Sequence, residues 1–166
     1  MRATITGLIR RVESDDWERL RDARLRALES DPDAFLETVE NARTFPDERW
    51  RERARPTERS VSFVYERGPA FDGMVSAFVG DDAETAFLVG MWVAPDLRGS
   101  SVARELVACV VEWSRGHGRV RVALSVEAGN DRAARLYEKC GFLRVDAPPA
   151  FPYEPSPGDA FYVYTL

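Results

Sequence analysis

The residues best suited to chemistry follow an apolar run near the middle of the chain. The segment VAPDLRGSSVA (93–103) has the pattern of a strand end, a proline turn and the first turn of a helix. The first N–H groups of a helix have no partner within it, and the helix dipole adds positive potential there. Gly99 lets the backbone approach an anion, and Arg98 adds a full charge. The segment predicts a phosphate-binding turn, and an ordinary strand-to-helix turn with a serine cap fits it equally well.

A second segment, NDRAARLYEKCGF (130–142), has the pattern of an amphipathic helix. Ala133, Leu136, Tyr137 and Cys140 recur at i, i+3, i+4 and i+7, so they share one face. By itself this pattern predicts a buried helix side, on which Tyr137 is a core residue with a hydrogen-bonded hydroxyl.

Taken together, the two segments resemble the GNAT superfamily of N-acetyltransferases. PDLRGSSVARELV, followed further along by NDRAARLYEKCGF, is similar to the family patterns R-G-x-G-x-[GA] and N-x-x-A-x-x-LYxKxGF, and the similarity covers about residues 85–145. The resemblance implies an α/β fold: a mixed, mostly antiparallel sheet, flanked by helices on both faces and split between strands ending near Val93 and Val126. It also implies that acetyl-CoA is the acyl donor and lies in the split.

The resemblance assigns roles to individual residues. Backbone groups of Trp92 and Val93 are expected to pair with the pantetheine arm, and the turn at 98–103 to hold the pyrophosphate. Tyr137 is expected to be catalytic and to face the cofactor together with Asn130. The implied cofactor-binding residues are Trp92, Val93, Arg98, Gly99, Ser100, Ser101, Val102, Ala103 and Asn130.

One residue departs from the family pattern. Ser101 stands where the family usually has its second glycine. Its Cβ would push a pyrophosphate away, whereas its hydroxyl would add a hydrogen bond. We therefore expect an altered affinity for the cofactor and a retained site.

Acyl transfer from a thioester to a primary amine poses two protonation problems. An alkylamine with a pKa of ~10.4 is almost wholly protonated at pH 7, and reaching its neutral form costs about 4.6 kcal/mol. The departing thiolate has a pKa of ~8.5 by analogy with cysteine, so a phenol with a pKa of ~10 is the weaker acid. We therefore expect Tyr137 to donate a hydrogen bond to the developing thiolate, with the proton arriving later from solvent.

The group that takes the proton from the amine is less clearly marked. The inward positions of the strand before the turn read VGMW (89–92), without a carboxylate. Glu84, near the start of that strand, and Glu127, after the next one, are the remaining candidate general bases. Each also fits a solvated surface carboxylate, and a water chain to backbone carbonyls would serve equally well.

The acceptor is expected to meet the amino-terminal helices and the Pro-rich loop at 148–159. RLRAL (24–28), followed by DPDAF (31–35), resembles the substrate-side helices of some small-molecule GNAT enzymes, which implies that Phe35 and Thr38 lie near the acetyl group. Acidic residues in the predicted rim loops suit a cationic amine, and they are Glu37, Glu40, Asp72 and Asp159.

The elements that must position these residues alternate between strand and helix patterns. Strands are predicted at 3–12, 60–66, 74–79, 85–94, 120–126, 142–145 and 160–166. Helices are predicted at 15–29, from Pro46 to Pro56 with Thr44 as the cap, at 100–115 and at 130–139. The order predicts one mixed α/β domain over residues 1–166.

Length and composition agree with one globular domain. The chain has 166 residues, of which 45% are hydrophobic and 31% charged. These values are ordinary for a folded domain and exclude the collagenous, low-complexity and disordered classes. The longest apolar run, 86–94, is too short to cross a bilayer, and the first residues lack the apolar run of a signal peptide. A cytoplasmic protein is expected.

The charge pattern bears on partners. A net charge of −5 gives no global reason to bind nucleic acid or an anionic membrane, yet residues 98–144 carry nine basic and five acidic side chains. This basic block covers the predicted phosphate-binding turn. Cys109 and Cys140 are expected to be free thiols, and one histidine without clustered cysteines argues against a metal site.

Three functional hypotheses remain open at this point. The first is an N-acetyltransferase that uses acetyl-CoA to modify a small-molecule amine, for which an antibiotic, a polyamine and an amino acid all remain open. The second is a non-catalytic sensor of the same fold that binds CoA, and the third is an acetyltransferase acting on protein amino termini or lysines. A homodimer to which the apolar last strand contributes is compatible with each of them.

Overall fold

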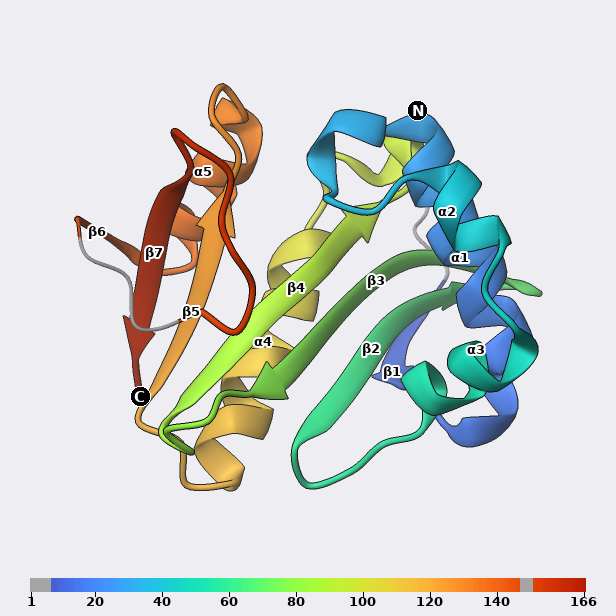
Figure 1. Ribbon diagram of the computed structural model, residues 1–166, viewed down its shortest axis with the longest axis horizontal. Coiled ribbons are helices and arrows are strands. Elements are labelled where there is room, and N and C mark those ends of the chain that lie inside the picture. Colours follow the sequence, from blue (N-terminus) through green and yellow to red (C-terminus); the bar gives the residue numbers. More distant parts are fainter. Residues whose placement is uncertain (1–6, 147–150) are drawn as a thin grey trace.

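The fold is an α/β sandwich built around one sheet, and the computed structural model describes residues 7–146 and 151–166 (Figure 1). The strands are β1 (Leu8–Arg11), β2 (Ser60–Arg67), β3 (Ala70–Val79), β4 (Thr85–Val93), β5 (Arg121–Val126), β6 (Leu143–Val145) and β7 (Ala160–Thr165). The α-helices are α1 (Trp17–Ser30), α2 (Val39–Arg43), α3 (Asp47–Ala54), α4 (Val102–Gly116) and α5 (Asp131–Lys139). Short 3-10 turns are η1 (Ser14–Asp16), η2 (Pro32–Ala34) and η3 (Pro95–Leu97).

The sheet is mixed and splits at its centre. In the described residues its strand order is β1-β2-β3-β4-β5-β7-β6, and every neighbouring pair is antiparallel except β4 and β5. The parallel pair is hydrogen-bonded only at Thr85–Phe87 against Arg121–Ala123, and the two strands then diverge. Beyond these residues β4 and β5 do not pair, so the sheet is split between them, as the resemblance to the GNAT superfamily implied.

Apolar patterning explains why β4 stands at the centre. The sequence TAFLVGMWV is almost uninterrupted by polar residues, which suits a strand covered on both faces. A register shift against β3 produces a β-bulge near Gly90, whose φ of +64° strongly favours glycine. The bulge lies where the strand begins to line the split.

Helices cover both faces of the sheet, also as predicted. In Figure 1 helix α4 lies behind the sheet, while α1, α2 and α3 lie on the other side, over the end formed by β1, β2 and β3. Helix α4 buries Leu106, Val107 and Val110 in the main core. Trp50 of α3 closes a smaller cluster with Leu28 and Ala42.

Several element boundaries differ from those predicted. Strand β3 starts at Ala70 because Gly68 and Pro69 alone form the turn, so the predicted long loop before Met74 is wrong. Helix α2 was missed because it has only five residues. Pro46, not Thr44, is the N-cap of α3.

The carboxyl-terminal strand is an interior strand. β7 pairs with β5 on one side and with β6 on the other, so its backbone edges are occupied and β6 forms the edge of the sheet. Residues 3–6 of the predicted first strand and 148–150 of the predicted Pro-rich loop lie outside the described residues. Within the described ranges, every helix is too short or too polar to cross a bilayer.

Candidate functional site

A cavity of about 460 Å³ occupies the split, and we call it the split cavity. One wall is β4, through Met91, Trp92 and Val93. The other walls are the turn that leads into α4 and one face of α5. The cavity therefore brings together the two sequence segments singled out above, which are separated along the chain by α4 and β5.

The turn before α4 presents unpaired backbone donors. Gly99 has a φ of +83°, a conformation that side chains rarely adopt, and its backbone lies open. Within the described residues, the N–H groups of Gly99, Ser101 and Ala103 donate no hydrogen bond. The Ser100 N–H donates to the Leu97 carbonyl at 3.1 Å, and the Val102 N–H donates to Oγ of Ser100 at 3.3 Å. Such a set of donors at a helix start fits a phosphate group.

The polar wall of the split cavity is strongly basic, which the sequence interpretation recognised only in part. Besides Arg98, four further cationic residues line it: Arg104, Arg132, Arg135 and Lys139. Three of them recur at i, i+3 and i+7 along α5, a signal that the sequence did contain. Asp31 is the acid among the lining residues, so the cavity carries an excess of positive charge suited to several phosphates.

Asp31 connects the end of α1 to both walls of the split cavity. Its Oδ2 accepts a hydrogen bond from Nη2 of Arg98 at 2.6 Å and from Nε1 of Trp92 at 3.2 Å. Burial alone would raise the pKa of Asp31, but hydrogen bonds from Ser30 and Arg98 outweigh burial and lower it. Asp31 is therefore ionised at neutral pH and holds Arg98 at the cavity.

Tyr137 lines the split cavity from α5 and is only 6% exposed. Its ring packs edge-on against Phe142, with 5.8 Å between ring centroids. Within the described residues its hydroxyl has no hydrogen-bond partner, and the prediction of a bonded core tyrosine is not met. Burial raises the pKa of the phenol well above its ordinary value, so Tyr137 stays protonated and serves as a donor.

The other predicted cofactor residues divide into two groups. Trp92, Val93, Arg98, Gly99, Ser100, Ala103 and Asn130 line the split cavity. Ser101 and Val102 do not, because Val102 points into the core and the Ser101 hydroxyl donates to Glu105 at 3.0 Å. Asn130 also has a structural role, since its side-chain oxygen caps α5 by accepting from the Ala133 N–H.

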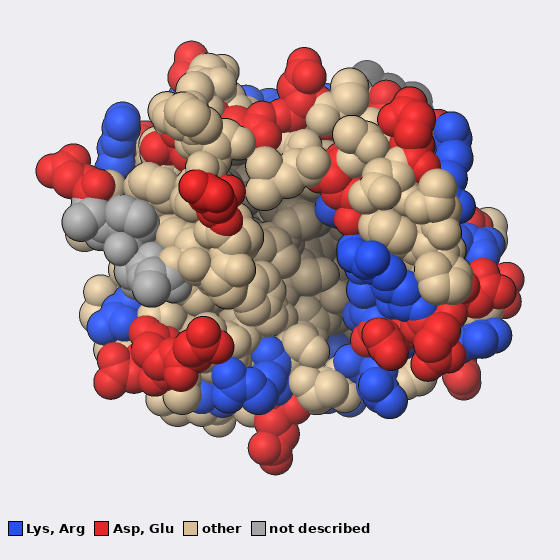
Figure 2. Space-filling view, in the orientation of Figure 1, with Lys and Arg blue, Asp and Glu red and all other residues tan. Residues whose placement is uncertain are grey.

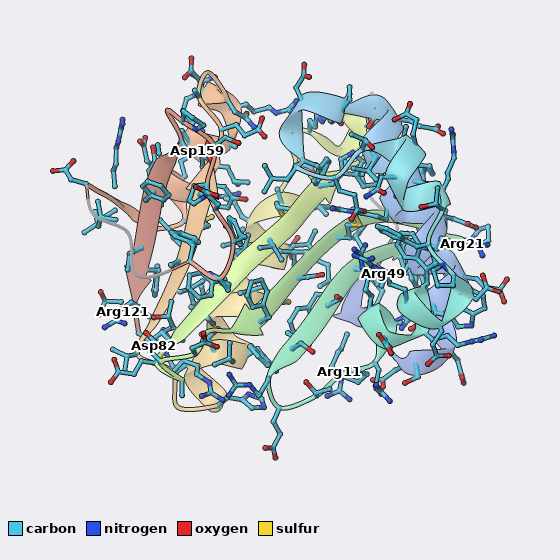
Figure 3. The ribbon with its side chains drawn as sticks, viewed as in Figure 1. Arg11, Arg21, Arg49, Asp82, Arg121 and Asp159 are labelled. Atoms are coloured by element: carbon cyan, nitrogen blue, oxygen red, sulfur yellow. The ribbon has the colours of Figure 1, made fainter. Side chains whose placement is uncertain are left out.

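The two candidate bases lie at opposite ends of the split. Glu84 stands just before β4 at the closed end, exposed and 3.7 Å from Arg121, and Figure 3 shows Arg121 at that end with Asp159 at the other. The structure thus does not bring Glu84 to the cavity. Glu127 follows β5 at the open end and also lines neither cavity. Burial and the charges of Asp159 and Asp33 raise its pKa.

A second cavity, of about 510 Å³, lies against β2, β3 and the bulge of β4 under α1 and α3. We call it the arginine cavity, because Arg24, Arg49 and Arg53 line it. In Figure 2 this face of the molecule is hollowed at its centre, with basic side chains along the right-hand side of the hollow. The two cavities meet where Gly90, which lines one, is followed by Met91, which lines the other.

The predicted acceptor residues fare differently. Phe35 lines the split cavity and lies under Arg24, 4.6 Å from its guanidinium. Thr38 is exposed, lines neither cavity and caps α2 by accepting from the Asn41 N–H. Glu37 and Asp72, expected to attract a cation, are each already ion-paired with two arginines.

Comparison with known proteins assigns the fold to a family. The model of the acetyltransferase (GNAT) family matches residues 17–142. The chain belongs to this family. The match spans α1 to the end of α5 and so includes the walls of both cavities.

Curated relatives of this GNAT chain are distant. It is 29% identical over 135 residues to mycothiol acetyltransferase of Beutenbergia cavernae, covering 72% of this chain and 39% of that protein. It is 27% identical over 100 residues to the uncharacterized N-acetyltransferase YjgM of Escherichia coli, covering 60% of each. The chain thus spans about two fifths and three fifths of these relatives' lengths.

Solved structures share the fold at low identity. The GNAT domain of S. lividans PAT superposes with a TM-score of 0.76 at 18% identity, covering 96% of this chain and 90% of that chain. YncA, described as a putative acetyltransferase from Salmonella typhimurium with its cofactor acetyl-CoA, gives 0.72 at 20% identity and covers 97% and 94%. These GNAT neighbours support the split-sheet architecture.

Proposed function

We propose that this GNAT protein transfers the acetyl group of acetyl-CoA to a primary amine of a small molecule. The observation that carries the proposal is the meeting, in one cavity, of unpaired N–H groups at Gly99 and Ala103 with the Tyr137 hydroxyl, which has no hydrogen-bond partner within the described residues. The first feature suits the phosphates of the donor, and the second suits its reacting sulfur. A core helix and an ordinary turn would need neither.

The residues present fit a CoA thioester. The basic wall formed by Arg98, Arg104, Arg132, Arg135 and Lys139 complements a ligand with several phosphates. The free edge of β4 beyond Phe87 offers backbone groups to an amide-bearing arm. When bound, the donor supplies the activated acyl group, and the protein's residues orient it and manage protons.

In the proposed reaction, the amine nitrogen attacks the carbonyl carbon directly while both substrates are bound. A carbon–nitrogen bond forms and the carbon–sulfur bond breaks, and the amine gives up one proton while the departing sulfur gains one. Tyr137 donates a hydrogen bond to the sulfur as negative charge develops on it. Glu127, at the open end of the split, is the carboxylate that receives the amine proton.

A small-molecule acceptor agrees with the shape of the second cavity. At about 510 Å³ the arginine cavity has the volume of a site for a small ligand, and it adjoins the split cavity at the β4 bulge. A protein amino terminus or lysine would enter as an extended segment and would need an open groove.

Release of free thiol from acetyl-CoA, measured against a panel of amines, tests the proposal. Turnover with at least one small amine, and none with peptides, is the expected result. A CoA sensor would instead be stabilised against heat by CoA and release no thiol with any amine. Acetylation of peptides alone would favour the protein acetyltransferase.

A further inference from the structure

The arginine cavity holds a partly buried cation, Arg24, most of whose hydrogen-bond donors have no partner. The side chain of Arg24 is 18% exposed, and its nearest acid is Glu37, with Nε 3.5 Å from Oε1. Arg53 holds the same carboxylate more closely, at 2.9 Å. Within the described residues the two terminal nitrogens of Arg24 have no hydrogen-bond partner. A guanidinium is never neutral in proteins, so these two nitrogens remain charged donors that can bind an anion entering the cavity.

The residues around the arginine cavity also carry an excess of positive charge. Glu37 serves two arginines, so Arg24, Arg53 and Glu37 together carry one positive charge in excess. Arg49 forms no ion pair within the described residues, and its guanidinium lies over the ring of Phe45, 3.7 Å from the ring centroid. Glu52 is the acidic lining residue, and it is exposed. This environment repels a second cationic group on the acceptor and attracts an anionic one.

The position of Arg24 fixes where that anionic group must be. A Cβ at Gly90 would lie 3.5 Å from a terminal nitrogen of Arg24, so the guanidinium lies against the β4 backbone. The next residue, Met91, lines the split cavity in which the acetyl group is proposed to lie. The anion and the attacking amine of the acceptor must therefore be close neighbours in the molecule.

The remainder of the arginine cavity is mainly apolar. Leu20 and Trp50 line it from the helices, and Met74, Phe78 and Val89 line it from the sheet. The Ser62 and Ser76 hydroxyls, also in the lining, share one hydrogen bond of 2.6 Å, so one of the two O–H donors is engaged. Such a surface suits an apolar side chain of considerable size.

We propose that the acceptor is an α-amino acid with a large apolar side chain, whose carboxylate is bound by Arg24. This inference rests on the proposed acetyltransferase function and narrows it to a substrate class. The α-amino group is then presented at the β4 bulge, and the side chain extends over Phe78 towards Trp50. The products are the N-acetyl amino acid and CoA with a free thiol.

Matched pairs of acceptors test the inference. L-phenylalanine and phenethylamine differ only in the carboxylate, as do L-leucine and 3-methylbutylamine. At saturating acetyl-CoA we expect kcat/KM to be about 100-fold higher for each amino acid than for its decarboxylated partner. Glycine and alanine are expected to be poorer acceptors than phenylalanine. The phosphonate analogue of phenylalanine separates a carboxylate site from a phosphate site, and a clear preference for it would overturn the α-amino acid.

Substitution of Arg24 tests the residue itself. Arg24→Gln is expected to bring the kcat/KM ratio for phenylalanine over phenethylamine close to one, while kcat/KM for phenethylamine changes by less than about threefold. Arg24→Lys keeps the charge and loses the planar guanidinium, so it should lower the kcat/KM ratio of phenylalanine over phenethylamine only partly. This conservative variant also controls for a folding defect caused by the loss of charge in Arg24→Gln. Arg21→Gln, on the same helix but lining neither cavity, is the matched control and should change neither substrate.

The possible failures are distinguishable. If simple amines are acetylated as well as amino acids, or if Arg24→Gln lowers both equally, the inference is wrong and the proposed function stands. If acetyl-CoA binds and neither class of acceptor releases thiol, the proposed function is wrong and the inference falls with it.

Discussion

Asp31 Oδ2 lies 2.6 Å from Nη2 of Arg98, and this contact joins the end of α1 to the phosphate-binding turn. The same oxygen lies 3.2 Å from Nε1 of Trp92, on the strand that forms the opposite wall of the split cavity. One carboxylate thus sets the relative position of the acceptor-side helix and both walls of the split cavity. Its contribution is measurable as stability and as a pH dependence.

Asp31→Ala is expected to lower the melting temperature by about 2–6 °C, because it leaves Arg98 without its carboxylate and the Trp92 N–H with Ser30 Oγ as its remaining acceptor. The pKa of Asp31 is lowered in the folded protein, so its contribution is present above the ordinary value of 3.8 and is lost as the pH falls below it. The difference in melting temperature between wild type and Asp31→Ala should therefore shrink as the pH is lowered from neutral to strongly acidic. Asp22→Ala, an exposed aspartate on the same helix, is the control. Equal melting temperatures for Asp31→Ala and wild type at pH 7 would contradict this role.

Ser101 places a hydroxymethyl group and, through Glu105, a carboxylate beside the donors of the turn. Its φ of −77° does not require glycine, so Ser101→Gly should leave the turn intact. Removing the Cβ and releasing Glu105 is expected to lower the dissociation constant for acetyl-CoA by about three- to tenfold. Calorimetric titration measures this directly. A dissociation constant equal to that of wild type would show that Ser101 has no part in cofactor affinity.

Much of the architecture could be predicted from the sequence, because local signals coincided with the tertiary arrangement. The apolar run of β4 predicted a central strand. The glycine before α4 predicted an open turn, and the periodic positions of α5 predicted a buried helix face. The short helix α2 gave too few periodic positions, and Thr38, its cap, was therefore taken for a substrate contact. The β-bulge at Gly90 could not be predicted from the sequence.

The acceptor side could not be predicted because its chemistry depends on residues far apart in the sequence. Arg24 comes from α1, Glu37 from the loop that precedes α2, and Arg53 from α3. The fold brings them together, so that the Glu37 carboxylate pairs with both arginines. A count of acidic residues suggested a cationic acceptor. Since Glu37 and Asp72 are ion-paired, arginines outnumber the remaining acid, Glu52, in the lining of the arginine cavity.

Glu127 and Glu84 form a natural pair of variants, one at each end of the split. Glu127→Gln is expected to lower kcat by about 100-fold, because it removes the carboxylate that receives the amine proton. The pKa of Glu127 is raised, so the acid limb of the wild-type kcat profile should lie above 4.5, with activity lost as the pH falls through it. Glu84→Gln should retain wild-type kcat. Wild-type kcat in Glu127→Gln would mean that the proton leaves through water.

The central claim is that Tyr137 assists departure of the CoA thiolate, and a combined measurement of turnover and binding on Tyr137→Phe tests it most directly. The raised pKa of Tyr137 keeps the wild-type phenol protonated beyond its ordinary value of 10.0, so its donor role persists throughout the working pH range. Tyr137→Phe keeps the ring and its packing on Phe142. With the best amine of the panel, thiol release should fall by about 10²- to 10⁴-fold while the dissociation constant for acetyl-CoA stays within about twofold. Undiminished thiol release by Tyr137→Phe would contradict the account.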